Sequence, residues 1–575
     1  MPSQRTRITT PESLAGPFAD LACRRLEKWS AAGRGGGILD PGCGSGLFLN
    51  LMMERLPHDQ GYSFCGIEVD EALARLAAQR LVHQNLKIYH GDFLFDGWRE
   101  VRNGGAVWNP ETQTFRAVIG NPPYLGFKSQ GAALRRRLSL TYGPGFGKCD
   151  LSGFSMMRSI QLVEPGGLIA LILPRYWLEG GTGKALRDQL IRECDIVEIR
   201  QWPGGHLFPG AGVQVLGLWA RKRHRPGSTG KMHYYLMPEN SMDGDPLDRR
   251  SMEYSKTREP WPLLLKSEER FLEILRSHGS ALETWAAPAQ GIITGADRSR
   301  GGGGIFVLDP EEVDDLKWTR EERRFLFPWI KSRQLEPLRV GKTPASLLHL
   351  PPETDLALLP GIRRHLLKYK SHLERRREVA KGRIPWWSLQ WGRKEELFRG
   401  ARILTPAKAR IVRAAAAPEG IRFSADIYTW RLCEGVLRRF EGVTARQAVF
   451  WLALYLSSRP GRIASRLLGK KLGSVVELYP QTQRLVPVPV PDSAGWRRIS
   501  QGMEGWLSPQ GIAACTPDEL YLQADDIVAS ILRPTAEEKD LMEEIESIWD
   551  PPVGAEGHFP NDIKPSLRPD QHQAE

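Results

Sequence analysis

The amino-acid sequence predicts an α/β protein whose N-terminal part is built on a mostly parallel sheet. Seven short apolar runs in the first 222 residues each end in a turn or polar residue, as buried strands do. Helical patterns lie between them, for example at residues 71–82 and 185–194. Strands that alternate with helices favour a parallel sheet that binds its ligands at the carboxyl ends of the strands. The strand-like runs are residues 35–43, 62–70, 86–92, 115–124, 166–174, 197–202 and 213–222.

The regular alternation ends near residue 225, which predicts a domain boundary. Beyond it the chain carries Gly-rich and Pro-rich turns, including the glycine run 301–304. A chain of 575 residues is too long for one compact core. We therefore expect an N-terminal domain at 1–225, a linker at 226–260, a second domain at 261–495 and an acidic helical tail at 496–575.

The composition argues against several classes of protein. The sequence has no run of 18 apolar residues and no apolar stretch behind its N-terminal basic residues, so we expect neither a membrane span nor a signal peptide. The seven cysteines never form a CxxC pair and are odd in number, which argues against a disulfide framework and a structural zinc. We expect reduced thiols, no bound metal and a cytoplasmic location.

Positive charge is concentrated in one part of the chain. The formal net charge is +12, and residues 361–470 alone hold 25 Lys and Arg against 8 Asp and Glu. Residues 501–575 hold 16 acidic and 4 basic residues. A solvated helix face is the alternative interpretation of the basic segment. The aromatic side chains interleaved with its cations argue against that interpretation, because a solvated face does not require them. Because cations neutralise phosphates and flat rings stack on bases, the segment predicts nucleic-acid contact. The candidate contacts are Arg375, Arg376, Arg377, Lys381, Arg383, Trp386, Trp387, Arg393 and Lys394.

A strand that ends in a glycine-rich turn stands near the start of the first domain. Residues 38–46 read ILDPGCGSG and lead into an apolar helix. Glycines allow positive φ angles and the close approach of a ligand, while a helix N-terminus offers free N–H groups. By itself this turn also suits an NAD site or a plain tight turn.

The next two strand ends narrow the choice of ligand. The second strand ends near Glu68, an acid at the place where ribose hydroxyls need an acceptor. The third is followed by Asp92 and Phe93, an acid for an amino group with a ring beside it. A pyrophosphate site would not place Asp40 and Pro41 directly before its turn. The three strand ends together predict an adenosine-bearing cofactor.

The fourth strand ends in Asn121-Pro122-Pro123-Tyr124. Two prolines fix φ and remove N–H donors, so they form a rigid corner that presents carbonyl acceptors. The side-chain carbonyl of Asn121 and the main-chain carbonyl of Pro122 can each accept one N–H of an amino group, which directs its nitrogen lone pair toward a methyl donor. Tyr124 can stack on the planar group that carries the nitrogen. A proline turn that merely ends a strand is the alternative, and the three preceding strand ends argue against it.

These residues resemble the amino-group methyltransferases that use S-adenosyl-L-methionine and carry a D/N/S-P-P-Y motif. The similarity is closest to the TaqI-like, class gamma, adenine-specific DNA methyltransferases of restriction–modification systems. That resemblance implies a Rossmann-like methyltransferase sheet followed by a C-terminal α+β DNA-recognition domain. It assigns Asn121, Pro122, Pro123 and Tyr124 to catalysis, with Phe208 packed against the target base. It assigns to the cofactor Thr10, Pro11, Asp40, Gly42, Gly44, Gly46, Glu68, Asp92 and Phe93.

The resemblance continues, through looser motifs, along the second half of the chain. Several segments are similar to ones that recur in the same order in the family's target-recognition domains. The partners that the resemblance implies are double-stranded DNA and, as a candidate, a separate cognate restriction endonuclease. We expect a monomer, because one methyl transfer needs one site. The similar segments are residues 291–297, 373–377, 385–387, 401–410, 451–458 and 485–489.

The reaction that the resemblance implies requires access to a base. A base inside a duplex cannot present its amino nitrogen to a bound cofactor, so we expect the target adenine to be flipped into a pocket formed by Tyr124, Phe208 and Asn121. The 6-amino nitrogen then attacks the sulfonium methyl in one in-line displacement, helped mainly by positioning. No covalent enzyme intermediate is required, so Cys43 and Cys149 are not nucleophile candidates.

Other interpretations share parts of the pattern. The NPPY motif also suits a protein glutamine amide, an RNA adenine or the 4-amino group of cytosine, and the basic segment favours DNA among these. Pro517-Asp518 with Glu537-Glu538-Lys539 formally fits a metal-dependent nuclease, but the segment is predicted as an acidic helix without strands to hold two carboxylates. A catalytically silent DNA-binding subunit is disfavoured because every motif residue is present. The recognition sequence does not follow from residue spacing.

Overall fold

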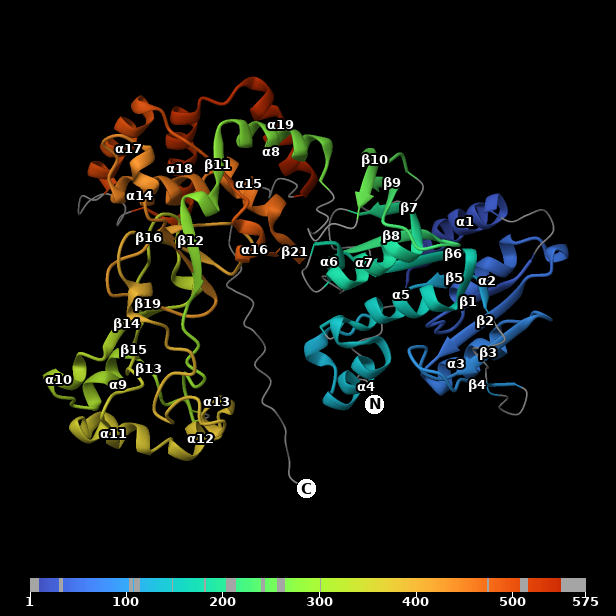
Figure 1. Cartoon of the computed structure of the whole chain (residues 1–575), viewed down its shortest axis with the longest axis horizontal. Helices are drawn as coiled ribbons and strands as arrows, with labels where there is room; N and C mark the ends of the chain where they lie inside the picture. The colour runs from blue at the N-terminus through green and yellow to red at the C-terminus, as the bar shows by residue number, and fades with distance from the viewer. Residues whose placement is uncertain are drawn as a thin grey trace.

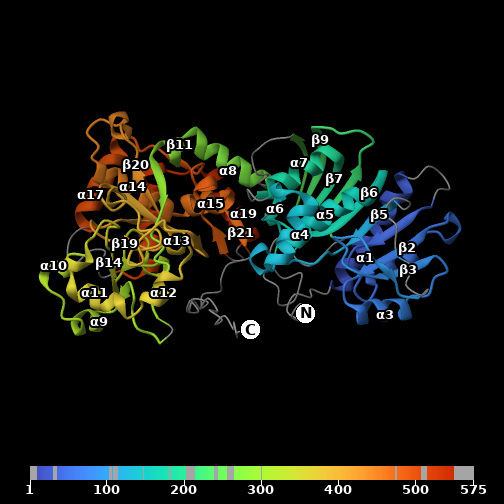
Figure 2. The same ribbon diagram turned by 60° about the horizontal axis from the view of Figure 1, so that its bottom comes forward.

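The protein forms two lobes, one from each half of the chain (Figures 1 and 2). Helix α8 (Lys266–Ser277) lies on the side where the lobes are joined. The computed structural model describes residues 10–29, 35–102, 107, 114–146, 148–179, 183–202, 214–238, 244–255, 264–299, 301–472, 475–506 and 515–549.

One large sheet forms the centre of the N-terminal lobe and confirms the predicted α/β class. Within the described ranges it has ten strands in the order β10-β9-β7-β8-β6-β5-β1-β2-β3-β4. The central strands β3, β2, β1, β5 and β6 are parallel, and β8 runs antiparallel between β6 and β7. Their bounds are β1 (Gly37–Asp40), β2 (Ser63–Glu68), β3 (Leu86–His90), β4 (Arg99–Glu100), β5 (Phe115–Gly120), β6 (Val163–Pro174), β7 (Cys194–Gln201), β8 (Val215–Lys222), β9 (Thr229–Leu236) and β10 (Asp248–Ser255).

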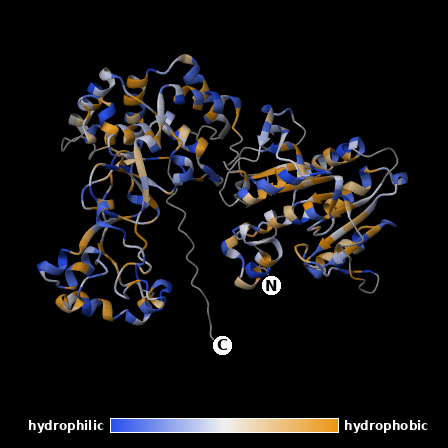
Figure 3. Ribbon diagram, in the orientation of Figure 1, coloured by the Kyte–Doolittle hydropathy of each residue, from blue (hydrophilic) through white to orange (hydrophobic). Residues whose placement is uncertain are grey.

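Both faces of the central strands are buried, as a mostly parallel sheet requires. Along β6, Leu168, Ala170 and Ile172 pack into one hydrophobic cluster, while Ile169 and Leu171 pack into another on the opposite face. Figure 3 shows these strands in the hydrophobic colour. The first cluster is completed by α1 (Glu12–Trp29), α2 (Leu47–Arg55) and α3 (Glu71–Arg80), and the second by α4 (Ala132–Tyr142), α5 (Leu151–Leu162) and α7 (Lys184–Glu193).

The strand order reverses between β1 and β5. From β1 the sheet continues through β2 and β3 to one side, and from β5 through β6 to the other. Open α/β sheets bind their ligands at the carboxyl ends of the strands beside such a reversal. Asp40 and Gly120 are the last residues of these two strands, so the glycine-rich turn and the NPPY motif begin at neighbouring strand ends.

The C-terminal lobe combines helices with small sheets, in agreement with the α+β expectation. In the part of the lobe that the structure describes, the two largest sheets have the orders β12-β20-β16-β18 and β13-β15-β14-β19. The strands are β11 (Gly279–Ala281), β12 (Ala286–Gln290), β13 (Val307–Leu308), β14 (Leu326–Ile330), β15 (Ala345–Leu348), β16 (Arg402–Pro406), β17 (Lys408–Ala409), β18 (Ala415–Ala416), β19 (Arg422–Phe423), β20 (Ile427–Leu432), β21 (Lys470–Leu472), β22 (Val475–Glu477) and β23 (Pro487–Pro489). The helices after α8 are α9 (Pro310–Asp315), α10 (Arg320–Arg323), α11 (Pro360–Leu367), α12 (Lys370–Glu374), α13 (Arg377–Ala380), α14 (Ala445–Ser457), α15 (Arg459–Leu468), α16 (Pro480–Gln483), α17 (Ser493–Trp506), α18 (Pro517–Leu532) and α19 (Ala536–Trp549).

The acidic tail packs against the C-terminal lobe as helices α18 and α19. Asp525 on α18 pairs with Arg462 at 3.1 Å, and Glu537 on α19 pairs with Arg270 at 2.9 Å. The residues that formally fit a nuclease pattern therefore lie on helices that bind cations of the same chain. Among the described residues, no group of three or more side chains could hold a metal ion, and no helix is long and apolar enough to cross a bilayer.

Candidate functional site

The glycine-rich turn joins β1 to α2 and is folded against the end of β2. The N–H of Cys43 donates to the carbonyl oxygen of Ile67 at 3.0 Å. Gly44 and Gly46 have positive φ angles of 53° and 92°, a region that glycine enters without a Cβ penalty. A Cβ at Gly46 would come within 2.5 Å of Leu81, while a Cβ at Gly44 would meet nothing within 4 Å. The turn is therefore packed behind Gly46 and open at Gly44.

Glu68, at the end of β2, holds this turn in place. One of its carboxylate oxygens accepts from the N–H of Gly44 at 3.0 Å, and the other accepts from the N–H of Asp70 at 2.9 Å. Each carboxylate oxygen has a second lone pair, so the side chain can still accept from a ligand hydroxyl. The carboxylate predicted to bind a ribose thus also fixes the loop beside it.

Asp40, at the end of β1, is a buried carboxylate with only 1% of its surface exposed. Burial raises its pKa to about 7, the hydrogen bond from the N–H of Gly42 opposes that rise, and the nearby charge of Glu68 adds to it. Gly120 on the adjacent strand leaves room for this side chain, since a Cβ there would lie 2.6 Å from the Asp40 carboxylate oxygen. A cationic ligand group beside Asp40 would favour its ionised form.

Asp92 and Phe93 follow the end of β3. The Asp92 carboxylate accepts from the N–H of Leu94 at 3.0 Å, and its main-chain carbonyl accepts from the indole N–H of Trp98 at 2.9 Å. Burial raises the pKa of Asp92, which the Leu94 N–H and the charge of Arg137 partly offset. The ring of Phe93 is 5% exposed and is stacked on Trp98 with centroids 6.0 Å apart. Phe93 therefore lies in the hydrophobic core next to Asp92.

The NPPY motif is held by residues from two other parts of the chain. The side-chain amide N–H of Asn121 donates to the hydroxyl of Thr10 at 3.0 Å, and its carbonyl oxygen accepts from the hydroxyl of Tyr124 at 2.5 Å. The Tyr124 hydroxyl also lies 3.0 Å from the carbonyl oxygen of Ile172 on β6. Burial raises the pKa of Tyr124 well above its usual value, so the hydroxyl remains a donor. These contacts orient the Asn121 amide without a ligand.

The two proline residues of the motif differ in exposure. Pro122 is buried and Pro123 is exposed. A Cβ built on Gly42 would lie 3.8 Å from Pro123, which brings the glycine-rich turn and the reacting motif into contact. Pro11 lies between Thr10 and the first residue of α1, and its carbonyl oxygen accepts from the N–H groups of Leu14 and Ala15 in the first turn of that helix. Phe208 lies outside the described residues.

Gln130 is a supporting residue that the sequence did not point out. Its side-chain amide donates to the carbonyl oxygens of Leu125 and Cys149, each at 3.0 Å, and only 3% of it is exposed. Asp150 then caps α5 by accepting from the N–H of Gly153 at 3.0 Å. These bonds tie the segment after the motif to α5. Because a buried glutamine and an exposed one look alike in a loop sequence, no sequence signal identifies Gln130.

The predicted DNA contacts divide into exposed and buried residues. Most of the exposed ones lie on or directly after α12 and α13 in the C-terminal lobe, where Arg383 pairs with Glu378 at 2.9 Å, while Lys394 precedes the 3-10 turn Glu395–Phe398. Trp386 and Trp387 are half-buried and pack against the core of that lobe, while Trp391 remains 46% exposed. We call five of the exposed cations the basic surface, namely Arg375, Arg377, Lys381, Arg383 and Lys394; Arg393 is exposed as well but bonds to the main chain.

Arg376 and Arg393 are positioned differently from their neighbours. Arg376 is 8% exposed, and it donates to the carbonyl oxygens of Leu373, Thr294 and Trp386 at 2.7–3.2 Å. Its guanidinium is satisfied inside the lobe, which corrects its expected place at the DNA surface. Arg393 has a φ of 67° and donates to the carbonyl oxygen of Gly291 at 3.0 Å, so it also ties chain segments together.

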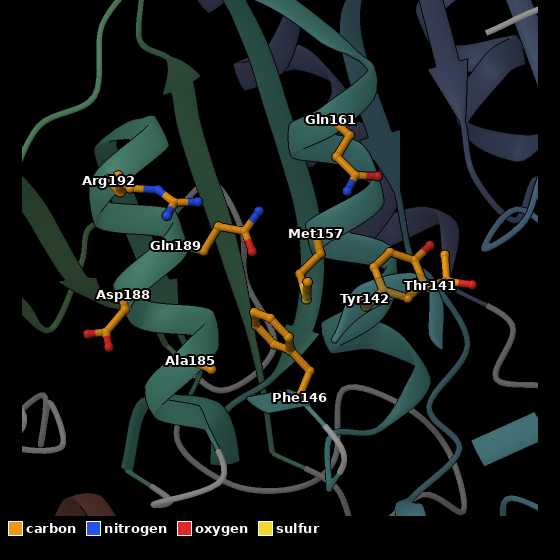
Figure 4. Close-up of a pocket in the computed structure, with 9 residues that line it drawn as sticks. All are labelled: Thr141, Tyr142, Phe146, Met157, Gln161, Ala185, Asp188, Gln189 and Arg192. Atoms are coloured by element: carbon orange, nitrogen blue, oxygen red, sulfur yellow. The ribbon is translucent and has the colours of Figure 1, made fainter. Parts of the chain in front are cut away.

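A pocket on the N-terminal lobe lies apart from the strand ends. It opens between α4, α5 and α7, and its lining includes Tyr142, Met157 and Gln189 (Figure 4). None of the described site residues lines it. The candidate site is therefore not this pocket but the group of side chains that meet at the carboxyl ends of β1, β2, β3 and β5.

The residues at this edge fit S-adenosylmethionine. The strand ends at 40–46, 68–70 and 91–93 carry four carboxylates and no Lys or Arg. Such a set suits ribose hydroxyls, an adenine amino group and a cationic centre, whereas it would repel a pyrophosphate. The open side of Gly44 leaves space for a ligand beside these acceptors.

Comparison with known proteins finds restriction-modification methylases. The family described as Eco57I restriction-modification methylase matches residues 65–208. The Type II methyltransferase M.TthHB8I of Thermus thermophilus is 29% identical over 226 residues, which are 38% of this chain and 45% of that protein. M.BanIII of Aneurinibacillus aneurinilyticus is 29% identical over 246 residues, which are 40% of this chain and 41% of that protein. The chain thus spans less than half the length of these curated relatives.

One solved structure extends the likeness to both lobes. The type IIL restriction-modification enzyme MmeI, solved in complex with DNA, aligns with 94% of this chain and 75% of its own, with a TM-score of 0.52 and 12% identity. At that identity the likeness concerns the fold. The N-terminal lobe therefore has a Rossmann-like sheet, and residues 65–208 within it match a restriction-modification methylase domain.

Proposed function

We propose that the chain is a DNA methyltransferase of restriction–modification type that transfers a methyl group from S-adenosylmethionine to the 6-amino group of an adenine. The observation that carries the proposal is Asn121, fixed between Thr10 and Tyr124 at the reversal point of the sheet. The family match over residues 65–208 and the two Type II methyltransferase relatives support it. The finer assignment to the TaqI-like class gamma group is part of the same proposal.

The strand ends would hold the cofactor. Glu68 would accept from the ribose hydroxyls, Asp92 from the adenine amino group, and the open turn around Gly42 and Gly44 would lie along the methionine part. The buried carboxylate of Asp40 would face a cationic group. When bound, S-adenosylmethionine supplies an electrophilic methyl group. Thr10 and Pro11 would lie beside the cofactor at this edge, because Thr10 contacts Asn121 and Pro11 follows it directly.

The motif would receive the amino group of the base. The side-chain oxygen of Asn121 and the carbonyl of Pro122 would each accept one N–H, so the nitrogen lone pair points away from both acceptors. Tyr124, and Phe208 from its loop, would pack against the extruded base, since an amino nitrogen in a duplex is out of reach. Positioned acceptors stabilise the positive charge that develops on the nitrogen.

The cysteines do not serve this reaction. Burial raises the pKa of Cys43 well above its usual value and the pKa of Cys149 to about 12, so neither forms a thiolate near neutral pH. A mechanism that needs a cysteine nucleophile, as in carbon-5 methylation of cytosine, is therefore disfavoured. Direct transfer to an exocyclic amino group needs no nucleophile from the protein.

Double-stranded DNA is the proposed substrate because the C-terminal lobe carries the basic surface. Exposed cations of that kind bind phosphates by releasing counterions. We further propose that the chain acts as a monomer in the cytoplasm, with a separate restriction endonuclease as its cognate partner. Protein glutamine and RNA adenine are the competing acceptors of the same motif.

Methyl transfer from labelled S-adenosylmethionine to unmethylated genomic DNA tests the proposal, followed by nucleoside analysis and mapping. N6-methyladenine at one short recurring sequence is the expected result. Label on cytosine would retain the DNA assignment and refute the adenine assignment. Label confined to an RNA or protein fraction would refute the DNA assignment. The Asn121→Ala variant is the control for contaminating methyltransferases, because it removes the side-chain acceptor.

A further inference from the structure

A second basic segment follows the NPPY motif directly. Residues 125–149 contain five Lys and Arg and no Asp or Glu. The segment includes a 3-10 turn at Phe127–Ser129 and the helix α4. Arg135 is half-buried and the other four cations are exposed. Within the described residues, none of the five forms an ion pair with an acidic side chain. The five cations are Lys128, Arg135, Arg136, Arg137 and Lys148.

The helix α4 is placed between the lobes. In both views it lies on the side of the N-terminal lobe that faces the C-terminal lobe, with α12 and α13 on the opposing lobe (Figures 1 and 2). The two hydrogen bonds donated by Gln130 fix the start of α4 to the segment after the motif. The cations on α4 and the part of the basic surface on and after α12 and α13 therefore lie on opposing lobes, and Gln130 links the segment after the reacting motif to the start of α4.

We infer that Lys128, Arg135 and Arg136 bind the phosphates of the DNA strand that carries the target base. The inference rests on the proposed function and adds a DNA contact on the N-terminal lobe to the one proposed on the C-terminal lobe. Arg135 lies over the ring of Phe127 with its guanidinium carbon 4.9 Å from the centroid, which holds it beside the turn that carries Lys128. Uncompensated cations held near one another suit a polyanion.

Other side chains of α4 hold the cofactor loop. The guanidinium carbon of Arg137 lies 3.5 Å from the centroid of Phe95, and the hydroxyl of Tyr142 donates to the carbonyl oxygen of Leu94 at 2.6 Å. Both contacts reach the loop that begins at Asp92. Removing Arg135 and Arg136 leaves these contacts in place, so the DNA contact can be tested without altering the cofactor site.

The test is the salt dependence of binding to a double-stranded DNA fragment of random sequence, compared for the wild type and an Arg135→Ala/Arg136→Ala variant. The slope of log K against log salt is negative, and two lost phosphate contacts make it shallower by roughly 2, since each contributes about 0.9. Affinity for S-adenosylmethionine is expected to stay unchanged. The matched control is Arg75→Ala/Arg80→Ala, which removes the same charge from exposed positions on α3, away from the C-terminal lobe. The single Lys128→Ala variant tests the exposed turn before α4, and it is expected to make the salt dependence of log K shallower by about 1.

The outcomes separate this inference from the proposed function. A less steep dependence of DNA binding on salt in the α4 variants, but not in the α3 control, supports the inference. An unchanged slope in α4 variants that retain cofactor binding overturns it while leaving the proposed function standing. If the wild type itself shows no DNA binding at low salt but still binds the cofactor, the DNA assignment fails and the inference with it.

Discussion

The hydroxyl of Tyr124 lies 2.5 Å from the side-chain carbonyl oxygen of Asn121, and the amide N–H of the same Asn121 donates to Thr10 at 3.0 Å. The two bonds fix which end of the amide is the acceptor, because a tyrosine hydroxyl with a strongly raised pKa remains protonated. A carbonyl oxygen has two lone pairs, so Asn121 can accept from Tyr124 and from a substrate amino group together.

Removal of the Tyr124 hydroxyl tests whether it orients the amide. We expect Tyr124→Phe to lower kcat about threefold to tenfold, because a typical hydrogen bond contributes about 0.5–1.5 kcal/mol. Tyr124→Ala should cost more, since base stacking on an aromatic ring contributes about 1–3 kcal/mol. Steady-state kinetics with DNA measures both, and equal activity of the Phe and Ala variants would contradict a stacking role.

Loss of the side-chain acceptor tests the central role of Asn121. We expect Asn121→Ala to reduce turnover on the order of 100-fold, as loss of one preorganised hydrogen-bonding group does in other active sites. The dissociation constant for S-adenosylmethionine should stay within about twofold of the wild type, because the carboxylates proposed to bind the cofactor, Asp40, Glu68 and Asp92, lie at other strand ends. Single-turnover kinetics and calorimetric titration check the two expectations. Retained turnover would remove Asn121 from the mechanism.

The pKa of Asp40 predicts a pH-dependent effect of its replacement. In the folded protein the carboxyl takes up a proton near pH 7, whereas its ordinary value is 3.8, so the wild type gains stability as the pH falls from above 7 toward 4. Asp40→Asn removes the buried charge, and we expect it to stabilise the fold above pH 7 by on the order of 1–3 kcal/mol, with the gain fading below pH 7. Denaturant unfolding at pH 6 and pH 8.5 measures this difference.

The same variant should bind the cofactor less well. A carboxylate beside a cationic ligand group contributes more than a neutral amide, so we expect roughly tenfold weaker binding of S-adenosylmethionine at pH 8. Wild-type affinity should also fall as the pH drops below 7, toward a limit roughly tenfold below its value at pH 8, because the protonated carboxyl is neutral like the amide. A more stable but equally tight-binding variant would show that Asp40 does not face the cofactor.

The close packing of Gly120 against Asp40 predicts that even one methyl group is harmful there. A Cβ at Gly120 would lie 2.6 Å from the carboxylate oxygen of Asp40 and 3.1 Å from Pro41, so the end of β1 would have to move. We expect Gly120→Ala to cost about 1–3 kcal/mol of folding stability, as overpacking does, and to weaken cofactor binding. The matched control is Gly126→Ala, where a Cβ meets nothing within 4 Å and φ is −61°. Similar losses in both variants would contradict the steric cause.

Replacement of two adjacent arginines should affect different properties, folding stability for Arg376 and DNA binding for Arg375. Arg376→Ala removes the donor of three buried carbonyl groups, and we expect a loss of about 2–4 kcal/mol of stability. Arg375→Ala should leave the melting temperature nearly unchanged and reduce the salt dependence of DNA binding by about 0.9 in slope. Thermal unfolding and binding titrations on both variants provide the check. If only Arg376→Ala changed the salt dependence of DNA binding, then Arg376 and not Arg375 would be the DNA contact.

The sequence by itself determined seven of the ten described strands of the N-terminal sheet; it missed β4, β9 and β10, and the last two lie in the segment 226–260 that was expected to be a linker. Strands buried on both faces form continuous apolar runs that end in, or are followed by, Asp40, Glu68, Asp92 and Asn121, so a local pattern was enough for these strand ends. Reversal of the strand order then brings these ends together at one edge. For the same reason the chemistry of the site could be predicted in outline.

Only the tertiary structure decided which partners hold these residues. Thr10 meets Asn121 across 111 positions of the chain, and Gln130 holds the segment after the motif, neither of which a local pattern encodes. In the run Arg375-Arg376-Arg377 one side chain is buried and two are exposed, because the lobe needs a donor for three carbonyls at that point. Burial depends on contacts between distant segments, and identical neighbours in a sequence carry no record of them.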